Sequence, residues 1–230
     1  MKELFASAAF SGAALTMAAY FMGVYIKNKT GNQFLNPILI AIVTIIGFLA
    51  LTGIDYDTYN SSAGYISWFL TPATVALAIP LYRQLEQLKT NVKAILLGIL
   101  SGVIASGAGI LLLAVAFNLS HTEYVTLLPK SITSAIGMGV ADELGGISAI
   151  TVPVIIITGI FGNVTADIVL KIAKVTNPIA KGLAIGTASH GTGTAKAIEM
   201  GQVEGAMSGL SIAVAGLITV AAAQIFALIR

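Results

Sequence analysis

The sequence contains no cysteine, and only 10% of its 230 residues are charged, with a net charge of +2. The lack of cysteine excludes disulfides, thiol chemistry and thiolate metal sites. A soluble domain usually has about 25% charged residues, so the low charge excludes a surface that faces water throughout. The small net charge is spread over short loops, so nucleic acid is not an expected partner.

Long uncharged windows are present instead. The residues are 57% hydrophobic, and the mean hydropathy is +0.92. Each window exceeds the roughly 20 residues that an α-helix needs to cross a bilayer. The windows are residues 4–26, 30–54, 58–82, 94–120, 144–166 and 205–229. The sequence therefore predicts an all-α, polytopic membrane protein, with residues 1–230 forming a single transmembrane domain.

Two further apolar windows contain ionisable residues and raise the number of hydrophobic elements to seven or eight. Residues 124–141 contain Lys130, and residues 182–198 contain His190 and Lys196. The second window includes GTASHGTGTAKA, which has three glycines in twelve residues. Glycine costs about 1 kcal/mol relative to alanine inside a helix. We therefore expect a broken or re-entrant helix, with the break near residues 191–193.

Charges in the loops indicate how the elements run, because basic loops face the cytoplasm. Basic and acidic loops alternate in the first half of the chain: Lys27 and Lys29, then Asp55 and Asp57, then Arg83, Lys89 and Lys93, then Glu123. In the second half, Lys171, Lys174 and Lys181 fall outside if residues 124–141 cross the membrane. If this segment dips in and returns, every basic loop falls inside. Both alternatives remain open.

The order of elements also suggests an internal repeat. A shift of about 112 residues lays 30–54 on 144–166 and 94–120 on 205–229, with matching elements running in opposite directions. Inverted repeats with broken helices are typical of secondary transporters. We expect one repeat at about 1–118 and the other at about 119–230. The shift places residues 69–80, which contain Pro72 and Pro80, opposite the histidine stretch.

Polar residues inside apolar elements are the candidates for a substrate site. A half-helix that begins after the break would present free N–H groups to an anion. Lys130 would supply a cation, or would instead mark the membrane edge by snorkelling, and His190 is the candidate for proton coupling. The glycines could equally serve close helix packing. The candidates are Thr71, Pro72, Thr74, Lys130, Ser131, Thr133, Ser189, His190, Gly191, Thr192, Gly193 and Thr194.

No pattern of an enzyme is present. Ser189 lies next to His190 but without a G-x-S-x-G elbow, and the chain has no phosphate-binding P-loop. His121 is too far in sequence from His190 to predict a metal pair. We therefore expect no catalytic residues, no bound metal and no cofactor.

Five motifs in this order are specific as a set: PATVALAIPLY at 72–82, LPKSIT at 128–133, GGISAI at 145–150, GLAIGTASHGTGTAKA at 182–197 and EGAMSGL at 204–210. In these residues the chain resembles the CidB/LrgB family of bacterial membrane proteins. Family members often have proline where Ala135 and Ser148 stand here. Because proline restricts the backbone, these two differences leave the shape of residues 124–150 open.

The resemblance implies two kinds of function. Relatives in plant chloroplasts move glycolate and glycerate, so we expect an inner-membrane transporter of small monocarboxylates such as glycolate, glycerate, lactate or pyruvate. It would be coupled to protons or would exchange anions. Bacterial members are described with a small holin-like partner of the CidA/LrgA type and with control of murein hydrolases and cell lysis. The alternative is therefore a membrane partner of such a protein, without a substrate. The sequence does not decide whether the chain forms a homodimer.

Overall fold

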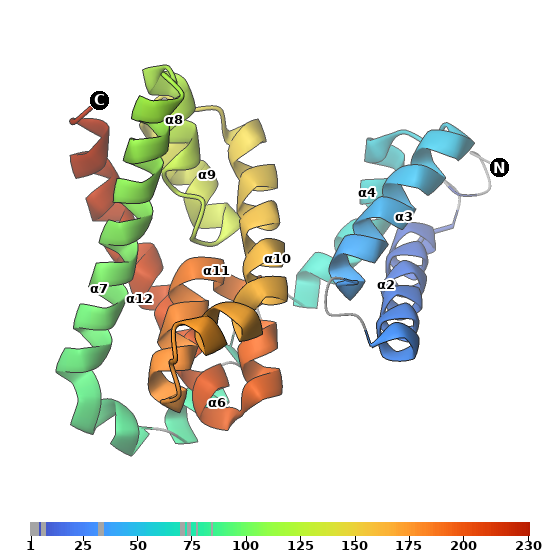
Figure 1. The fold of residues 1–230 in the computed structure, drawn as a ribbon. Helices are drawn as coiled ribbons and strands as arrows, with labels where there is room; N and C mark the ends of the chain where they lie inside the picture. The colour runs from blue at the N-terminus through green and yellow to red at the C-terminus, as the bar shows by residue number, and fades with distance from the viewer. Residues whose placement is uncertain are drawn as a thin grey trace. The chain divides into compact units, whose positions relative to one another are not determined.

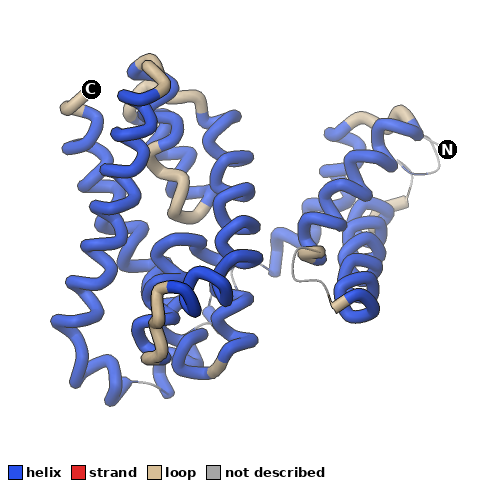
Figure 2. Tube along the Cα trace, in the orientation of Figure 1, coloured by secondary structure: helices blue, strands red, loops and turns tan. Residues whose placement is uncertain are grey.

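The computed structural model describes residues 5, 8–31, 35–69, 72, 75–76, 78–83 and 85–230. Every regular element within these ranges is helical, as predicted, and short loops join the helices (Figure 2). The chain divides into two compact units, Met1–Ala76 and Leu77–Arg230. The units are described separately below.

The elements that the structure describes in the first unit are three α-helices and a 3₁₀ helix. These are α2 (Ser11–Thr30), α3 (Pro37–Thr52), α4 (Tyr56–Ala63) and η1 (Gly64–Phe69). Asn36 begins α3, because its side chain accepts a hydrogen bond from the backbone N–H of Ile38 at 2.8 Å. The N–H of Gly12 donates to Ser62 Oγ at 2.8 Å, which joins α2 to α4.

The window 58–82 differs from the single apolar span that its composition predicts. Most of its described residues belong to α4, to η1 and, in the second unit, to α6 (Ala78–Arg83). The polar run Asn60–Ser62 and the following Gly64 favour short helical pieces over one long helix. Residues 70–71, 73–74 and 77 of this window lie outside the described ranges.

The second unit contains the longest helices. Besides α6, its helices are α7 (Leu85–Ala116), α8 (His121–Leu127), α9 (Ser134–Glu143), α10 (Ser148–Ile172), α11 (Pro178–Met200) and α12 (Gln202–Ala227) (Figure 1). Within the described part of the chain, three helices are long and apolar enough to cross a membrane: residues 89–116, α10 and α12. The helix α3 is apolar but shorter. The seven or eight hydrophobic elements expected from the sequence stay a prediction.

The helices α8 and α9 form a hairpin. Residues 128–133 between them are not helical, and Gly146, just after α9, lies beside Thr126 of α8. The backbone N–H of Ile147 donates to Thr126 Oγ1 at 2.8 Å, which joins the C-terminal end of α8 to the segment that follows α9. Residues 124–141 therefore fold back on themselves, the second of the two alternatives that the loop charges left open.

The helix α11 also reverses direction. His190 has φ 42° and ψ −136°, so the predicted break is present, at the residue before the expected glycines. A Cβ on Gly193 would lie 3.2 Å from the carbonyl oxygen of Ile185. In an unbroken helix, the eight residues from Ile185 to Gly193 would span about 12 Å. The much shorter distance shows that the chain turns back. We call residues 178–189 the first arm of α11 and residues 191–200 its second arm.

The turns of the two hairpins lie at the same level of the bundle. Ser106 Oγ donates to Ser131 Oγ, in the α8–α9 turn, at 3.3 Å. Thr187, near the end of the first arm, lies against Gly102, one helical turn from Ser106. Ser106 is ten residues, about 15 Å, from the C-terminal end of α7. The hairpins thus enter from opposite ends of the bundle and meet near the middle of α7.

Five lysines lie at one end of this unit. Lys89, Lys93, Lys171, Lys174 and Lys181 lie where α7 and α11 begin and α10 ends. We assign this end to the cytoplasm by the positive-inside rule. Arg230 departs from the expected pattern, because it lies at the other end, where it donates to the carbonyl oxygen of Leu119 at 2.6 Å. The reason is that α11 turns back, so α12 begins at the cytoplasmic end.

Candidate functional site

The turn of the α8–α9 hairpin carries a lysine into the middle of the bundle. Lys130 Nζ donates to Ser131 Oγ at 2.8 Å. Ser131 is buried, and Ile132 beside it is almost fully buried. No carboxylate in the described ranges pairs with Lys130. Since an ammonium group in an apolar region favours a partner of opposite charge, this lysine is the strongest candidate for binding an anionic group.

Hydrogen bonds within α11 and to the neighbouring helices α10 and α12 hold the turn of α11. His190 Nε2 lies 3.0 Å from the carbonyl oxygen of Ile155 in α10. Because a carbonyl can only accept, Nε2 carries the proton and Nδ1 is free to accept one. Thr194 Oγ1 donates to the carbonyl oxygen of His190 at 3.0 Å and lies 2.7 Å from Ser208 Oγ in α12. These bonds fix the left-handed conformation that a residue with a side chain rarely adopts.

Two grooves flank the first arm of α11. One lies between α7 and this arm and is lined by Ser106, Ser131 and Thr187 among others. The other lies between α10 and this arm and is lined by Ser189 among others. Lys130 lines both grooves. The sequence-predicted Lys130 therefore lies near Ser131 in one groove and near Ser189 in the other.

Thr187 is a polar residue that the sequence analysis did not select. Its side chain is 6% exposed, and its Oγ1 has no hydrogen-bond partner among the described residues. A buried hydroxyl without a partner costs about 1–3 kcal/mol, so it is a candidate for contact with a ligand. Ser106 was missed for a different reason: it is one hydroxyl inside the uncharged window 94–120, and only the fold places it beside Ser131.

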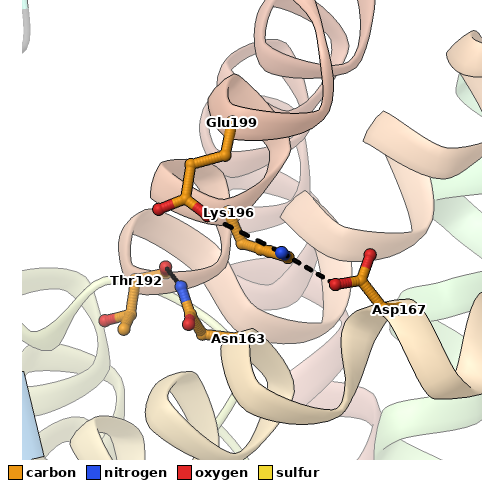
Figure 3. Close-up of polar contacts among 5 residues, drawn as sticks. All are labelled: Asn163, Asp167, Thr192, Lys196 and Glu199. Atoms are coloured by element: carbon orange, nitrogen blue, oxygen red, sulfur yellow. Dashed lines mark hydrogen bonds and ion pairs between the residues drawn. The ribbon is translucent and has the colours of Figure 1, made fainter. Parts of the chain in front are cut away.

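Hydrogen bonds and an ion pair hold the second arm of α11 against α10 (Figure 3). Asn163 Nδ2 donates to the carbonyl oxygen of Thr192 at 2.7 Å. Lys196 Nζ forms an ion pair with Asp167 at 2.7 Å and a longer one with Glu199 at 3.6 Å. Lys196, which the sequence showed as an ionisable residue inside an apolar window, thus has a structural partner.

The remaining predicted residues have varied surroundings. Gly193 packs against Ser189 and Ile185, whereas Gly191 is exposed with open space around it. Thr133 precedes α9 without capping it through its side chain. Pro72 belongs to the first unit and is exposed, and Thr71 and Thr74 lie outside the described residues. The expected approach of residues 69–80 to the histidine stretch and the inverted repeat stay predictions.

Comparison with known proteins gives a consistent result. The LrgB-like family matches residues 16–229. The chain is 38% identical over 218 residues to the antiholin-like protein LrgB of Bacillus subtilis (strain 168), which covers 94% of each chain. It is 40% identical over 205 residues to the holin-like protein CidB of Staphylococcus aureus (strain Mu50 / ATCC 700699), which covers 89% of this chain and 90% of the relative. No solved structure matches the chain with significance.

Proposed function

The chain belongs to the LrgB-like family and is a multi-pass protein of the bacterial cell membrane, and from this premise we propose that it is the membrane component of a holin/antiholin-type system. In this role it would control murein hydrolase activity and cell lysis together with a separate, small holin-like membrane protein. The observation that carries the proposal is the identity of 38–40% over about nine-tenths of the chain to proteins named for that role.

The buried polar groups suggest how such a protein would work. Control through a separate membrane protein would require the two proteins to assemble, and polar side chains inside an apolar bundle favour particular partners. Lys130 supplies such a group at mid-depth, where α7 and the two hairpin turns meet. Assembly would then depend on whether a partner satisfies this lysine.

The test is murein hydrolase activity in a bacterium from which the gene for this chain has been deleted. We expect zymograms of the deletion strain to change, and expression of the wild-type chain to restore the original pattern. Lys130→Met should fail to restore it, whereas Lys171→Gln, an exposed lysine at the end of α10, should succeed. An unchanged zymogram in the deletion strain would contradict the proposal.

A second candidate function is the passage of small monocarboxylates across the membrane. The observation that favours it is the pair of opposed hairpins, whose turns bring Lys130, Ser131 and Ser189 together beside the unpartnered Thr187. Broken helices that meet at mid-depth are a recurrent way to build a solute site. The free Nδ1 of His190 would accept the proton in a coupled cycle.

Counterflow of labelled glycolate, glycerate, lactate and pyruvate in proteoliposomes tests this candidate. We expect saturable flux that Lys130→Met abolishes, while His190→Gln removes only the part that a pH gradient drives. Lys171→Gln serves as the matched control. Absence of flux for all four acids, in vesicles where a control transporter is active, would leave the holin-type function alone.

A further inference from the structure

The groove between α7 and the first arm of α11 is longer than the polar site at its end. One part of it is lined by Asn91, Ala94 and Ala180, and the part beside Lys130 is lined by Ser106 and Ala188. The two parts share Gly98, Leu183 and Ala184, so they form one continuous groove. We call it the α7–α11 groove. From Ala94 to Ser106 it rises twelve residues, or about 18 Å.

Small residues line both walls of the α7–α11 groove. On α7, Ala94, Gly98 and Ala105 are exposed, and on α11 the alanines at 180, 184 and 188 are exposed at intervals of four residues. In membranes, such spacing lets the backbone of another helix approach closely, because no bulky side chain intervenes. The spacing alone does not show that the groove has a partner.

Two polar groups inside the groove indicate an occupant with polar chemistry. Thr187 lines the groove, and its Oγ1 is buried without a partner within the described part of the chain. Lys130, at the inner end, donates to Ser131 but is paired with no described carboxylate. Lipid chains could satisfy neither group. A carboxylate on an occupant, at the level of Ser106, would satisfy the ammonium group of Lys130.

We infer that the α7–α11 groove seats one transmembrane helix of a separate membrane protein, and that this helix carries a carboxylate which pairs with Lys130. The acidic residue would lie about 12 residues from the cytoplasmic end of the groove, as the length of the groove requires. Small residues on the helix would face the two alanine- and glycine-lined walls. This inference rests on the proposed holin-type function, because it names the partner that the function requires.

Within the described part of the chain, no carboxylate of a second copy lies near the middle of an apolar helix. The apolar helices α2 and α3 contain no acidic residue. Glu86 and Glu204 lie in the first turns of α7 and α12, far from mid-depth, and Asp167 is held by Lys196. Charge complementarity therefore favours a different protein over a homodimer.

The test uses synthetic transmembrane peptides and the full-length protein in vesicles. Because the chain has no cysteine, Leu112→Cys, an exposed position on α7 beyond the groove, accepts a single fluorophore. The first probe is a leucine- and alanine-rich helix with one aspartate twelve residues from its end, and the second has asparagine in its place. Energy transfer from the protein to the labelled peptide reports binding.

We expect the aspartate peptide to bind about tenfold more tightly than the asparagine peptide. Lys130→Met should remove this difference. Ala184→Leu, which fills the groove, should weaken both peptides, whereas Ala213→Leu, at an exposed alanine of α12 outside it, should weaken neither. Equal binding of the two peptides, or binding that Ala184→Leu leaves unchanged, would overturn the inference.

Other occupants give distinct results. Disulfide formation between two copies of the Ala184→Cys variant without peptide would assign the groove to a homodimer and overturn the inference. Displacement of the peptide by glycolate would assign Lys130 to a free anion, with the same consequence. The zymogram test is independent of these readouts. Peptide binding as expected with unchanged hydrolase activity would refute the holin-type function and leave the docking surface standing.

Discussion

Substitution of Gly186 tests the packing that holds the first arm of α11 in place. A Cβ at this position would lie 2.8 Å from both Ser208 Cα and Ser211 Cβ in α12, and closer still to the carbonyl oxygen of Ser208. Ordinary contact begins at 3.4 Å. The atoms in the way include backbone, so a side-chain rotation cannot relieve the overlap, and the two helices must separate.

The cost can be isolated with a matched control. Overpacking of this kind costs about 1–3 kcal/mol. Gly209→Ala, in α12, introduces the same methyl group where nothing lies within 4 Å. Since both variants gain about 1 kcal/mol of helix propensity, their difference in unfolding free energy reports the packing term alone.

The assay is reversible unfolding in mixed detergent micelles, followed by circular dichroism. We expect Gly186→Ala to be less stable than Gly209→Ala by about 1–3 kcal/mol. Equal stability of the two variants would refute the close contact between the first arm of α11 and α12, and with it the position of the α11 turn.

Three further predictions concern contacts at the ends of the bundle. Lys196→Gln and Asp167→Asn should show a coupling of about 0.5–1 kcal/mol in a double-mutant cycle of unfolding free energies, because the pair is only partly buried. Arg230→Gln should lower the unfolding free energy by about 1 kcal/mol through the loss of its hydrogen bonds to the α7–α8 loop. Hydrogen bonds from the backbone and side chain of Ser120 lower the pKa of Glu123 below its usual 4.5. The stability contributed by the ionised Glu123 is present above 4.5 and is lost as the pH falls through the lowered pKa, so Glu123→Gln should flatten the acid limb of the unfolding midpoint measured against pH.

Each of these predictions has a result that contradicts it. Additive effects of the two substitutions at 196 and 167 would show that the ion pair in Figure 3 is absent in the membrane. An effect of Arg230→Gln no larger than that of Arg83→Gln, an exposed arginine, would show that the C-terminal contact contributes nothing. An unchanged acid limb in Glu123→Gln would exclude the capping interaction with Ser120.

The helical membrane fold and the break in α11 could be predicted from composition, because uncharged windows and clustered glycines act locally. The break falls at His190, one residue before the expected glycines, since the bonds of His190 to Ile155 and of Thr194 to Ser208 depend on neighbouring helices. The return of α11 could not be predicted from Gly186–Ala197 alone. A break shows that a helix ends, whereas the contact between Gly193 and Ile185 decides which way the chain then runs.

The residues of the candidate site also divide into those that the sequence predicted and those that only the fold reveals. Lys130 and Ser131 were found because they are polar within an apolar element, and the structure joins them by a hydrogen bond. Ser106 was missed because single hydroxyls in helices commonly bond to their own backbone. Thr187 lies in the hydroxyl-rich stretch 186–197 but was not chosen as a site residue. Only the placement of α7 against the first arm of α11 shows that Thr187 lacks such a partner.

The most direct test of the account is the sidedness of both hairpins, measured with single cysteines in this cysteine-free chain. Thr122, Asp142, Thr176 and Gln202 are exposed positions just inside or beside the bases of the hairpins. A membrane-impermeant maleimide should label Thr122→Cys and Asp142→Cys from one face of the membrane, and Thr176→Cys and Gln202→Cys from the other. Labelling of Thr176→Cys and Gln202→Cys from opposite faces would show that α11 crosses the membrane and would contradict the meeting of two opposed hairpins.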